Sequence, residues 1–221
     1  MDKRDLAKHI DHTALQATTT KADLEKLCRE AAAAGCASVC LPPSRVSEAK
    51  AYLNELKATT AVCTVIGFPL GYQSATIKLV EATQAIHDGA DEIDVVINQG
   101  FVKDGAWEDV QNELTALRVA TQDKILKVII ETCNMTEAEK IRLCEVVTAV
   151  GADYIKTSTG FGSAGAKLED IDLFKQHIGP NVKIKAAGGI GTIAEMEAFI
   201  AAGAERLGSS RGLQALGLAE A

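Results

Sequence analysis

Hydrophobic and polar positions along the chain alternate between two patterns. Short apolar or β-branched runs are followed by longer amphipathic stretches rich in Ala, Leu and Glu, and this unit returns every 23 to 33 residues. The spacing matches a strand, a loop, a helix and a second loop. The runs predict eight strands, at residues 9–15, 37–41, 61–68, 92–98, 125–131, 154–156, 182–187 and 205–210.

The amphipathic stretches between these runs predict helices with recognisable ends. Thr-x-x-Glu segments at 136–139 and 192–195 are capping boxes, which mark helix starts. Gly35, Gly89, Gly151 and Gly203 each follow a predicted helix, where a left-handed residue commonly ends it. The predicted helices span residues 21–34, 44–57, 74–89, 106–120, 137–149, 168–177 and 193–202.

Eight strands alternating with helices fit either a closed (β/α)₈ barrel or an open doubly wound sheet. Strands of a doubly wound sheet are covered by helices on both faces and should be apolar on both. Here one strand face is apolar and the other is repeatedly charged. The charged positions are Glu92, Asp94, Glu131, Lys127, Lys156, Lys183 and Lys185, three acids and four bases that would converge inside a barrel. We therefore predict an α/β fold in which residues 1–221 form a single-domain (β/α)₈ TIM barrel.

Bulk properties narrow the possible partners and the compartment. The 221 residues are 47% hydrophobic and carry a formal net charge of −7 with no basic cluster, which argues against nucleic acid as a partner. No apolar run approaches the ~20 residues of a membrane span, and the charged start lacks a secretory apolar centre. Six dispersed cysteines fit reduced thiols rather than disulfides or a zinc site. We expect a cytoplasmic protein without membrane or nucleic-acid partners.

Two lysines end neighbouring strands of the predicted barrel, where active sites of such barrels lie. Lys156 ends the sixth strand, Lys185 lies near the end of the seventh, and Asp94 lies in the fourth, on the opposite side of the mouth. These charges could be structural ion pairs that fill a polar interior. Alternatively, one lysine is a nucleophile, because a second ammonium nearby favours its uncharged form. The pattern alone leaves both interpretations open.

The loops after the last two strands suggest an anion site. The seventh strand is followed by Gly188 and Gly189, which let backbone N–H groups approach an anion, and the eighth contains Ser209 and Ser210. In barrels of this kind, these two loops often bind phosphate.

Six segments together resemble the deoxyribose-phosphate aldolase family over essentially the whole chain. They are IDHTAL, VIGFPLG, EIDVVIN, YIKTSTGFG, VKIKAAGGI and GSSRG, in the family's order. The resemblance implies a class I aldolase that reversibly cleaves 2-deoxy-D-ribose 5-phosphate to D-glyceraldehyde 3-phosphate and acetaldehyde. It further implies that Lys156 forms the imine, that Lys185 lowers its pKa, and that Asp94 transfers protons with a water.

The resemblance also implies roles for residues around these three. Asp11, Thr13 and Cys40 match positions on the substrate side of the pocket, and the implied phosphate cradle is Gly160, Gly188, Gly189, Ser209 and Ser210. The imine replaces the metal of a class II aldolase, so we predict no metal and no cofactor. The family further suggests a homodimer acting on small phosphosugar and aldehyde substrates.

Two departures from the family pattern affect substrate choice and proton transfer. Phe161 stands where many relatives carry a phosphate-binding lysine, so selection for a phosphorylated sugar should weaken. The chain ends in LAEA, without the terminal tyrosine of some relatives. Two alternative functions stay open: a phosphosugar isomerase or epimerase using a lysine as base, and a non-catalytic sugar-phosphate-binding protein.

Overall fold

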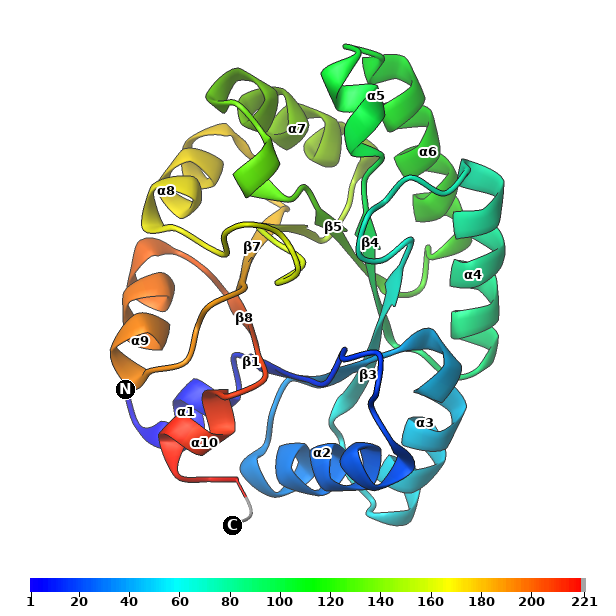
Figure 1. Cartoon of the computed structure of the whole chain (residues 1–221). Helices are drawn as coiled ribbons and strands as arrows, with labels where there is room; N and C mark the ends of the chain where they lie inside the picture. The colour runs from blue at the N-terminus through cyan, green and yellow to red at the C-terminus, as the bar shows by residue number, and fades with distance from the viewer. Residues whose placement is uncertain (220–221) are drawn as a thin grey trace.

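The computed structural model describes residues 1–219, and the last two residues of the terminal LAEA segment lie outside this range. Eight parallel strands close into a barrel in sequence order, with β1 paired to both β2 and β8. This confirms the predicted barrel, and Figure 1 shows the helices arranged around the strands. The strands are β1 (Ile10–Thr13), β2 (Ser38–Leu41), β3 (Ala61–Ile66), β4 (Glu92–Val96), β5 (Ile125–Ile129), β6 (Tyr154–Lys156), β7 (Lys183–Ala187) and β8 (Arg206–Ser209).

The helices follow the predicted order, with short additions. The longer ones are α2 (Lys21–Ala34), α3 (Val46–Glu55), α4 (Ala75–His87), α6 (Trp107–Ala120), α7 (Glu137–Val150), α8 (Leu168–His177) and α9 (Ile193–Ala202). The short elements are α1 (Lys3–Ala7), α5 (Gln99–Lys103), α10 (Gly212–Leu216) and the 3₁₀ turns η1 (Pro43–Arg45) and η2 (Thr132–Asn134). Elements of five residues or fewer are too short to show a helical period, so the pattern missed them.

The predicted helix ends are confirmed by their local geometry. Both capping boxes form, because Thr136 and Thr192 each accept a hydrogen bond from the backbone N–H three residues on, whose glutamate side chain accepts in return. Gly35 and Gly151 end their helices with φ of 73°, a conformation that is costly for a residue with a Cβ. These caps fix where each helix turns back toward the next strand.

Several strands end earlier than the sequence pattern predicts. The runs at 61–68, 92–98 and 125–131 leave the sheet after Ile66, Val96 and Ile129. Their last residues continue the apolar pattern but form the loops at the barrel mouth. The apolar strand face packs against the helices as expected, and Ile93, Val95 and Leu126 are fully buried. No helix within residues 1–219 is long and apolar enough to cross a membrane.

Two of the seven charged residues predicted to point into the barrel do not do so. Lys183 begins β7, is exposed, and pairs with Glu205 at 3.3 Å. Glu131 lies beyond the end of β5 with φ of 52°, and its carboxylate accepts hydrogen bonds from the backbone and hydroxyl of Thr159. Both corrections arise because strand alternation gives the face of a residue but not its height along the barrel axis.

Candidate active site

The two lysines at the mouth lie side by side. Lys156 and Lys185 are register partners on β6 and β7, so their side chains leave the sheet on the same face. Each ammonium donates a hydrogen bond of 2.7 Å to the same oxygen, Oδ2 of Asp94. The two nitrogens are therefore separated by at most twice that distance. Lys185 is fully buried, and Lys156 is nearly so.

The sequence suggested that Asp94 lies across the mouth from the two lysines. In the structure its carboxylate lies between them. Its second oxygen, Oδ1, accepts a hydrogen bond of 2.7 Å from Lys127 of β5. Burial alone would raise the pKa of Asp94, but the three ammonium groups of Lys127, Lys156 and Lys185 hold it well below its usual range. Asp94 is thus a carboxylate held in its charged form by three cations.

A second tier of charges lies beneath this group. Asp11 of β1 accepts hydrogen bonds from Lys185, from Arg206 of β8 and from Ser38. Glu92 accepts from Lys127 at 2.6 Å and from both terminal nitrogens of Arg206. Among residues 1–219, the ion network in the barrel interior therefore joins three carboxylates and four cations: Asp11, Glu92 and Asp94 with Lys127, Lys156, Lys185 and Arg206.

The three lysines around Asp94 differ in the number of carboxylates with which each one pairs. Lys127 has a second carboxylate in Glu92, and Lys185 has a second one in Asp11, whereas Asp94 is the one carboxylate that pairs with Lys156 in the described chain. Burial would lower the pKa of Lys185, but Asp11 and Asp94 raise it above its ordinary value. Lys185 is therefore a fixed positive charge beside Lys156.

Asp11 and Cys40 were expected on the substrate side of the pocket, and the structure places both deeper. Asp11 is fully buried within the ion network, and Cys40 is buried beside its register partner Cys63. Thr13 does line the cavity with Lys156, and its hydroxyl donates a hydrogen bond of 2.8 Å to the backbone carbonyl of Asp11.

Lys156 opens to a cavity of about 230 Å³ that brings the predicted phosphate residues together. The five cradle residues, Gly160, Gly188, Gly189, Ser209 and Ser210, all line it. The three glycines have φ of 86°, 87° and 83°, which other residues adopt at a cost. The Ser209 hydroxyl donates to the Ile190 carbonyl at 2.6 Å, so this side chain ties the two loops together. Within the five cradle residues, the hydrogen-bond donors that can still bind an anion are therefore the exposed Ser210 hydroxyl and the backbone N–H groups.

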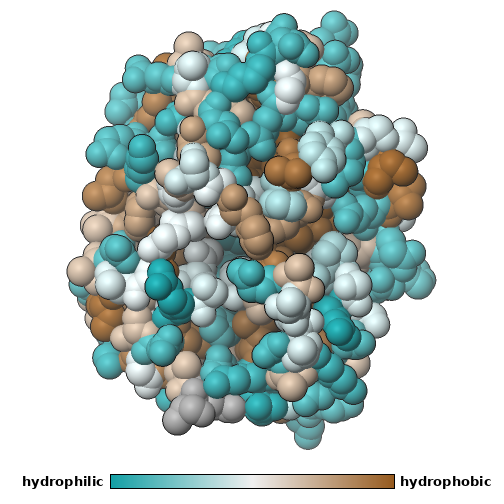
Figure 2. All heavy atoms as spheres, viewed as in Figure 1, coloured by the Kyte–Doolittle hydropathy of each residue, from teal (hydrophilic) through white to brown (hydrophobic). Residues whose placement is uncertain are grey.

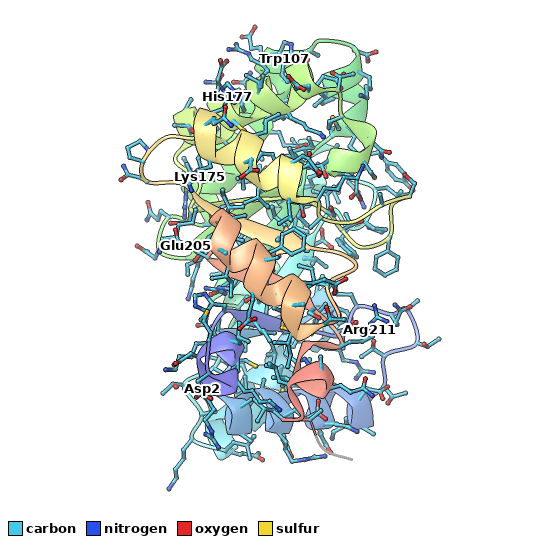
Figure 3. The ribbon with its side chains drawn as sticks, turned by 90° about the vertical axis from the view of Figure 1, so that its left-hand side faces the viewer. Asp2, Trp107, Lys175, His177, Glu205 and Arg211 are labelled. Atoms are coloured by element: carbon cyan, nitrogen blue, oxygen red, sulfur yellow. The ribbon has the colours of Figure 1, made fainter. Side chains whose placement is uncertain are left out.

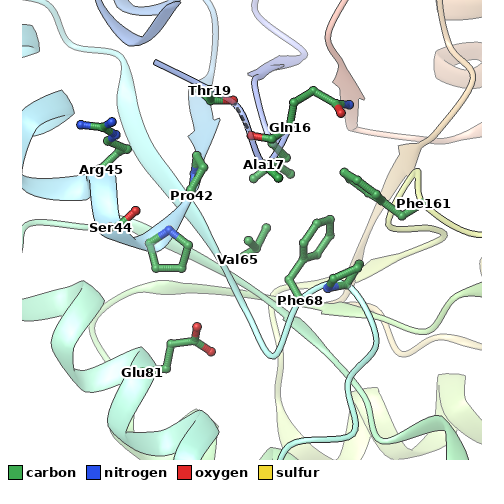
Figure 4. Close-up of a pocket in the computed structure, with 13 residues that line it drawn as sticks. Gln16, Ala17, Thr19, Pro42, Ser44, Arg45, Val65, Phe68, Glu81 and Phe161 are labelled. Carbon is green, nitrogen blue, oxygen red and sulfur yellow. Dashed lines mark hydrogen bonds between the residues drawn. The ribbon is translucent and has the colours of Figure 1, made fainter. Parts of the chain in front are cut away.

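A second cavity, of about 400 Å³, adjoins the first at Leu15, Gln16 and Phe161. Figure 4 shows Phe68 and Phe161 facing one another in it, and their rings meet edge to face with centroids 5.3 Å apart. Phe161 therefore forms part of an apolar wall between the two cavities. Figure 2 shows residues of apolar or intermediate hydropathy toward the centre of this face, within a more hydrophilic periphery.

Sequence reasoning missed the roles that three residues play in shaping the site. Arg206 belongs to the ion network, and its alternation with buried Leu207 in β8 was a usable signal. Glu131 holds the loop that carries Phe161, because its carboxylate binds Thr159, whose hydroxyl in turn accepts from the Phe161 N–H at 3.0 Å. Arg211 lines the Lys156 cavity, although nothing in a single arginine after two serines marks it.

Potential metal donors also converge in the interior. The donor atoms of Cys40, Cys63 and Asp94 lie within 4.8 Å of one another. However, the Lys127 ammonium binds both Cys63 Sγ, at 3.2 Å, and Asp94 Oδ1, and so places a positive charge among these donors. Burial also raises the pKa of Cys63 well above its ordinary value, which disfavours the thiolate that a metal requires. These donors do not fit a metal ion, and the absence of a metal requirement stays a prediction.

Fold and site together define a class: a (β/α)₈ barrel enzyme with a buried lysine beside a carboxylate at its C-terminal mouth. Residues 5–216 match the model of the DeoC/LacD family aldolases, and the chain belongs to this family. It is 54% identical over 205 residues to the deoxyribose-phosphate aldolase of Clostridioides difficile, covering 93% of this chain and 92% of that one.

Other relatives agree with this assignment. The deoxyribose-phosphate aldolase of Streptococcus pyogenes (strain MGAS10750) is 48% identical over 211 residues, covering 96% of this chain and 93% of that one. The solved tetrameric deoxyribose phosphate aldolase of Aeropyrum pernix superimposes with a TM-score of 0.90 at 30% identity, covering 98% and 91% of the two chains. The relatives support the aldolase interpretation of the sequence and not the isomerase or the non-catalytic one.

Proposed function

We propose that this protein is a class I aldolase that reversibly cleaves 2-deoxy-D-ribose 5-phosphate to D-glyceraldehyde 3-phosphate and acetaldehyde. The observation that carries the proposal is the position of Lys156. Its ammonium pairs with Asp94, lies beside the fixed charge of Lys185, and opens to the cavity formed by the cradle residues. An imine-forming lysine needs this combination of access, a proton acceptor and a neighbouring cation.

The first step requires Lys156 to lose its proton. Among the described residues, the ion network holds four cations and three carboxylates, and Lys185 places a second ammonium beside Lys156. Lys156 is the member of the network that opens to the cavity. Its neutral amine then attacks the C1 aldehyde carbon of the open-chain sugar to form a carbinolamine, which loses water to give a protonated imine.

Carbon–carbon cleavage follows from the imine. The C2–C3 bond of the sugar breaks, so that C1 and C2 remain bound to Lys156 as a two-carbon enamine and C3 to C5 leave as glyceraldehyde 3-phosphate. 

The C3 hydroxyl loses its proton, its oxygen becomes the new aldehyde oxygen, and the electron pair of the C2–C3 bond moves into the imine to give an enamine.

The remaining steps return the enzyme to its starting state. C2 of the enamine takes up a proton, and water then hydrolyses the resulting imine to release acetaldehyde and free Lys156. Asp94 moves the protons in these steps, with a water reaching the more distant atoms. Its hydrogen bond of 2.7 Å to the reacting nitrogen supports this role. Lys185 and Lys127 hold that carboxylate from its other sides.

Trapping of the imine tests this function. Incubation with acetaldehyde and borohydride should convert Lys156 to N-ethyl-lysine, a net gain of C₂H₄. Lys156→Ala should abolish both this adduct and retro-aldol turnover while the fold is retained. Lys167→Ala removes an exposed lysine from the loop before α8 and serves as the matched control. Substantial turnover in Lys156→Ala would refute the assignment, and an isomerase or epimerase using lysine as a base would leave no adduct.

We further propose that the enzyme acts in the cytoplasm in deoxyribonucleotide catabolism, as one barrel domain that forms a homodimer. Apolar side chains exposed at the start of α4 and in the loop before it support an interface there: Leu70, Tyr72, Ile77 and Val80 are each more than half exposed, at 52%, 69%, 55% and 63%. Sedimentation velocity on the purified chain tests the oligomeric state.

A further inference from the structure

We infer that Arg211 binds the substrate phosphate and restores the positive charge that Phe161 does not supply. This inference rests on the proposed aldolase function, because it names what selects the phosphorylated substrate in the same site. Arg211 lies two residues beyond the end of β8 and lines the Lys156 cavity. Figure 3 shows it on the side of the molecule away from Glu205, which precedes β8.

The charge of the cavity lining points to an anionic ligand. Among the described residues that line it, the charged side chains are Lys156 and Arg211, and neither Asp nor Glu is present. Lys156 pairs with Asp94, and its nitrogen is consumed when the imine forms. Arg211 is therefore the cation that stays available to a phosphate group throughout the reaction.

The Arg211 side chain is free to take a ligand. Within residues 1–219 it forms no ion pair. The nearby acid Glu195 accepts hydrogen bonds from the backbone N–H groups of Gly191 and Thr192, each at 2.9 Å, and these bonds lower its pKa more than the charge of Arg211 does. The backbone N–H of Arg211 donates to Ser209 Oγ at 3.2 Å, which anchors the residue to the loop after β8. The guanidinium is thus tethered at its backbone but open at its tip.

Gly191 makes room for this guanidinium in the loop after β7. A Cβ at this position would lie 3.1 Å from Nη2 and 3.2 Å from Cζ of Arg211, a tight contact that would require the guanidinium to shift by a few tenths of an ångström. The arginine therefore lies over the backbone of the loop that contains Gly188 and Gly189. A planar guanidinium beside these backbone donors can bind two phosphate oxygens at once, as a lysine cannot.

This arrangement reverses the expectation drawn from Phe161 alone. The cavity keeps a cation for phosphate, supplied from the loop after β8 rather than from the loop after β6. Wild-type enzyme should therefore prefer 2-deoxyribose 5-phosphate over 2-deoxyribose. Phe161 instead packs against Phe68 and forms the apolar wall.

Substitution of Arg211 tests the inference through the ratio of kcat/KM for these two sugars. Arg211→Gln should lower the ratio between about tenfold and a hundredfold, the range for losing a charge-assisted hydrogen bond, with little change for 2-deoxyribose. Arg211→Lys should retain part of the preference. Competitive inhibition by inorganic phosphate should weaken in parallel in Arg211→Gln.

Arg45→Gln is the matched control, because this arginine lines the neighbouring cavity and pairs with Glu48 at 3.0 Å. It should leave the ratio unchanged. An unchanged ratio in Arg211→Gln, or an equal fall in Arg45→Gln, would overturn the inference. Failure of the proposed function is distinguishable, since wild-type enzyme would then form no borohydride adduct with acetaldehyde, a ligand that carries no phosphate.

Discussion

Asp94→Asn separates the chemical role of this carboxylate from its structural one. The substitution keeps the shape of the side chain but removes a charge that three ammonium groups contact, each at 2.7 Å. Lys127 retains Glu92, and Lys185 retains Asp11. Lys156 loses the carboxylate with which it pairs, so its ammonium is the member of the group left uncompensated.

The structure sets the expected size of both effects. Removing one partner of a buried ion pair costs about 3–5 kcal/mol. Because two of the three lysines keep another carboxylate, we expect a loss near the lower end, about 3 kcal/mol in the free energy of unfolding. Removing a general acid–base group should lower kcat by about 10²–10⁴. Imine formation should persist, because the amine and the cavity remain.

Three measurements check this prediction: urea unfolding, steady-state retro-aldol turnover, and borohydride trapping with acetaldehyde. Glu92→Gln is the control, because Glu92 is a buried acid of the same network that contacts Lys127 and Arg206 but not Lys156. It should lose comparable stability and much less turnover. If Asp94→Asn retained turnover within about tenfold of wild type, a factor worth only about 1.4 kcal/mol of barrier, Asp94 would not be the proton-transfer group.

Two further predictions concern stability. The depressed pKa values of Asp11 and Asp94 mean that their contributions to stability are complete above the unfolded value of about 3.9 and are lost as the pH falls below it, at up to about 1.4 kcal/mol per pH unit each. Urea unfolding between about pH 2 and pH 5 measures this slope, and a slope that is unaltered in Asp94→Asn would contradict the prediction. Lys78 and Glu113 form a buried ion pair at 2.7 Å outside the site, so Lys78→Met should lower the free energy of unfolding by about 3–5 kcal/mol by leaving the Glu113 charge unpaired. The double variant Lys78→Met/Glu113→Leu should recover most of this loss in urea unfolding, and a double variant no more stable than Lys78→Met would contradict the prediction.

The repeat of strands and helices was readable because each element satisfies its own local requirement. Helix α2 (Lys21–Ala34), for example, has the predicted bounds, since its periodic apolar face, its N-terminal cap and Gly35 are all encoded within the segment. The closed barrel was also predictable, because strands such as β4 are charged on one face and apolar on the other. A doubly wound sheet would have buried those charges beneath helices.

Individual side chains were harder to place. Lys183 and Lys185 share a strand face, yet Lys183 is exposed at the bottom of the barrel and Lys185 is fully buried within it. The alternation of residues along a strand does not give their position along the barrel axis. That position decides whether a charged side chain contacts solvent or other charged side chains. The same limit hid Arg211, whose importance depends on the loop after β7 lying beside it.

The sequence by itself determined the order of elements, the closed sheet and the residue types at the mouth, because these depend on contacts within one segment or between neighbouring strands. Only the tertiary structure decided that Asp94 of β4 lies between Lys156 of β6 and Lys185 of β7. That contact joins residues 62 and 91 positions apart, and its geometry follows from the closure and stagger of the whole barrel, which no local pattern records.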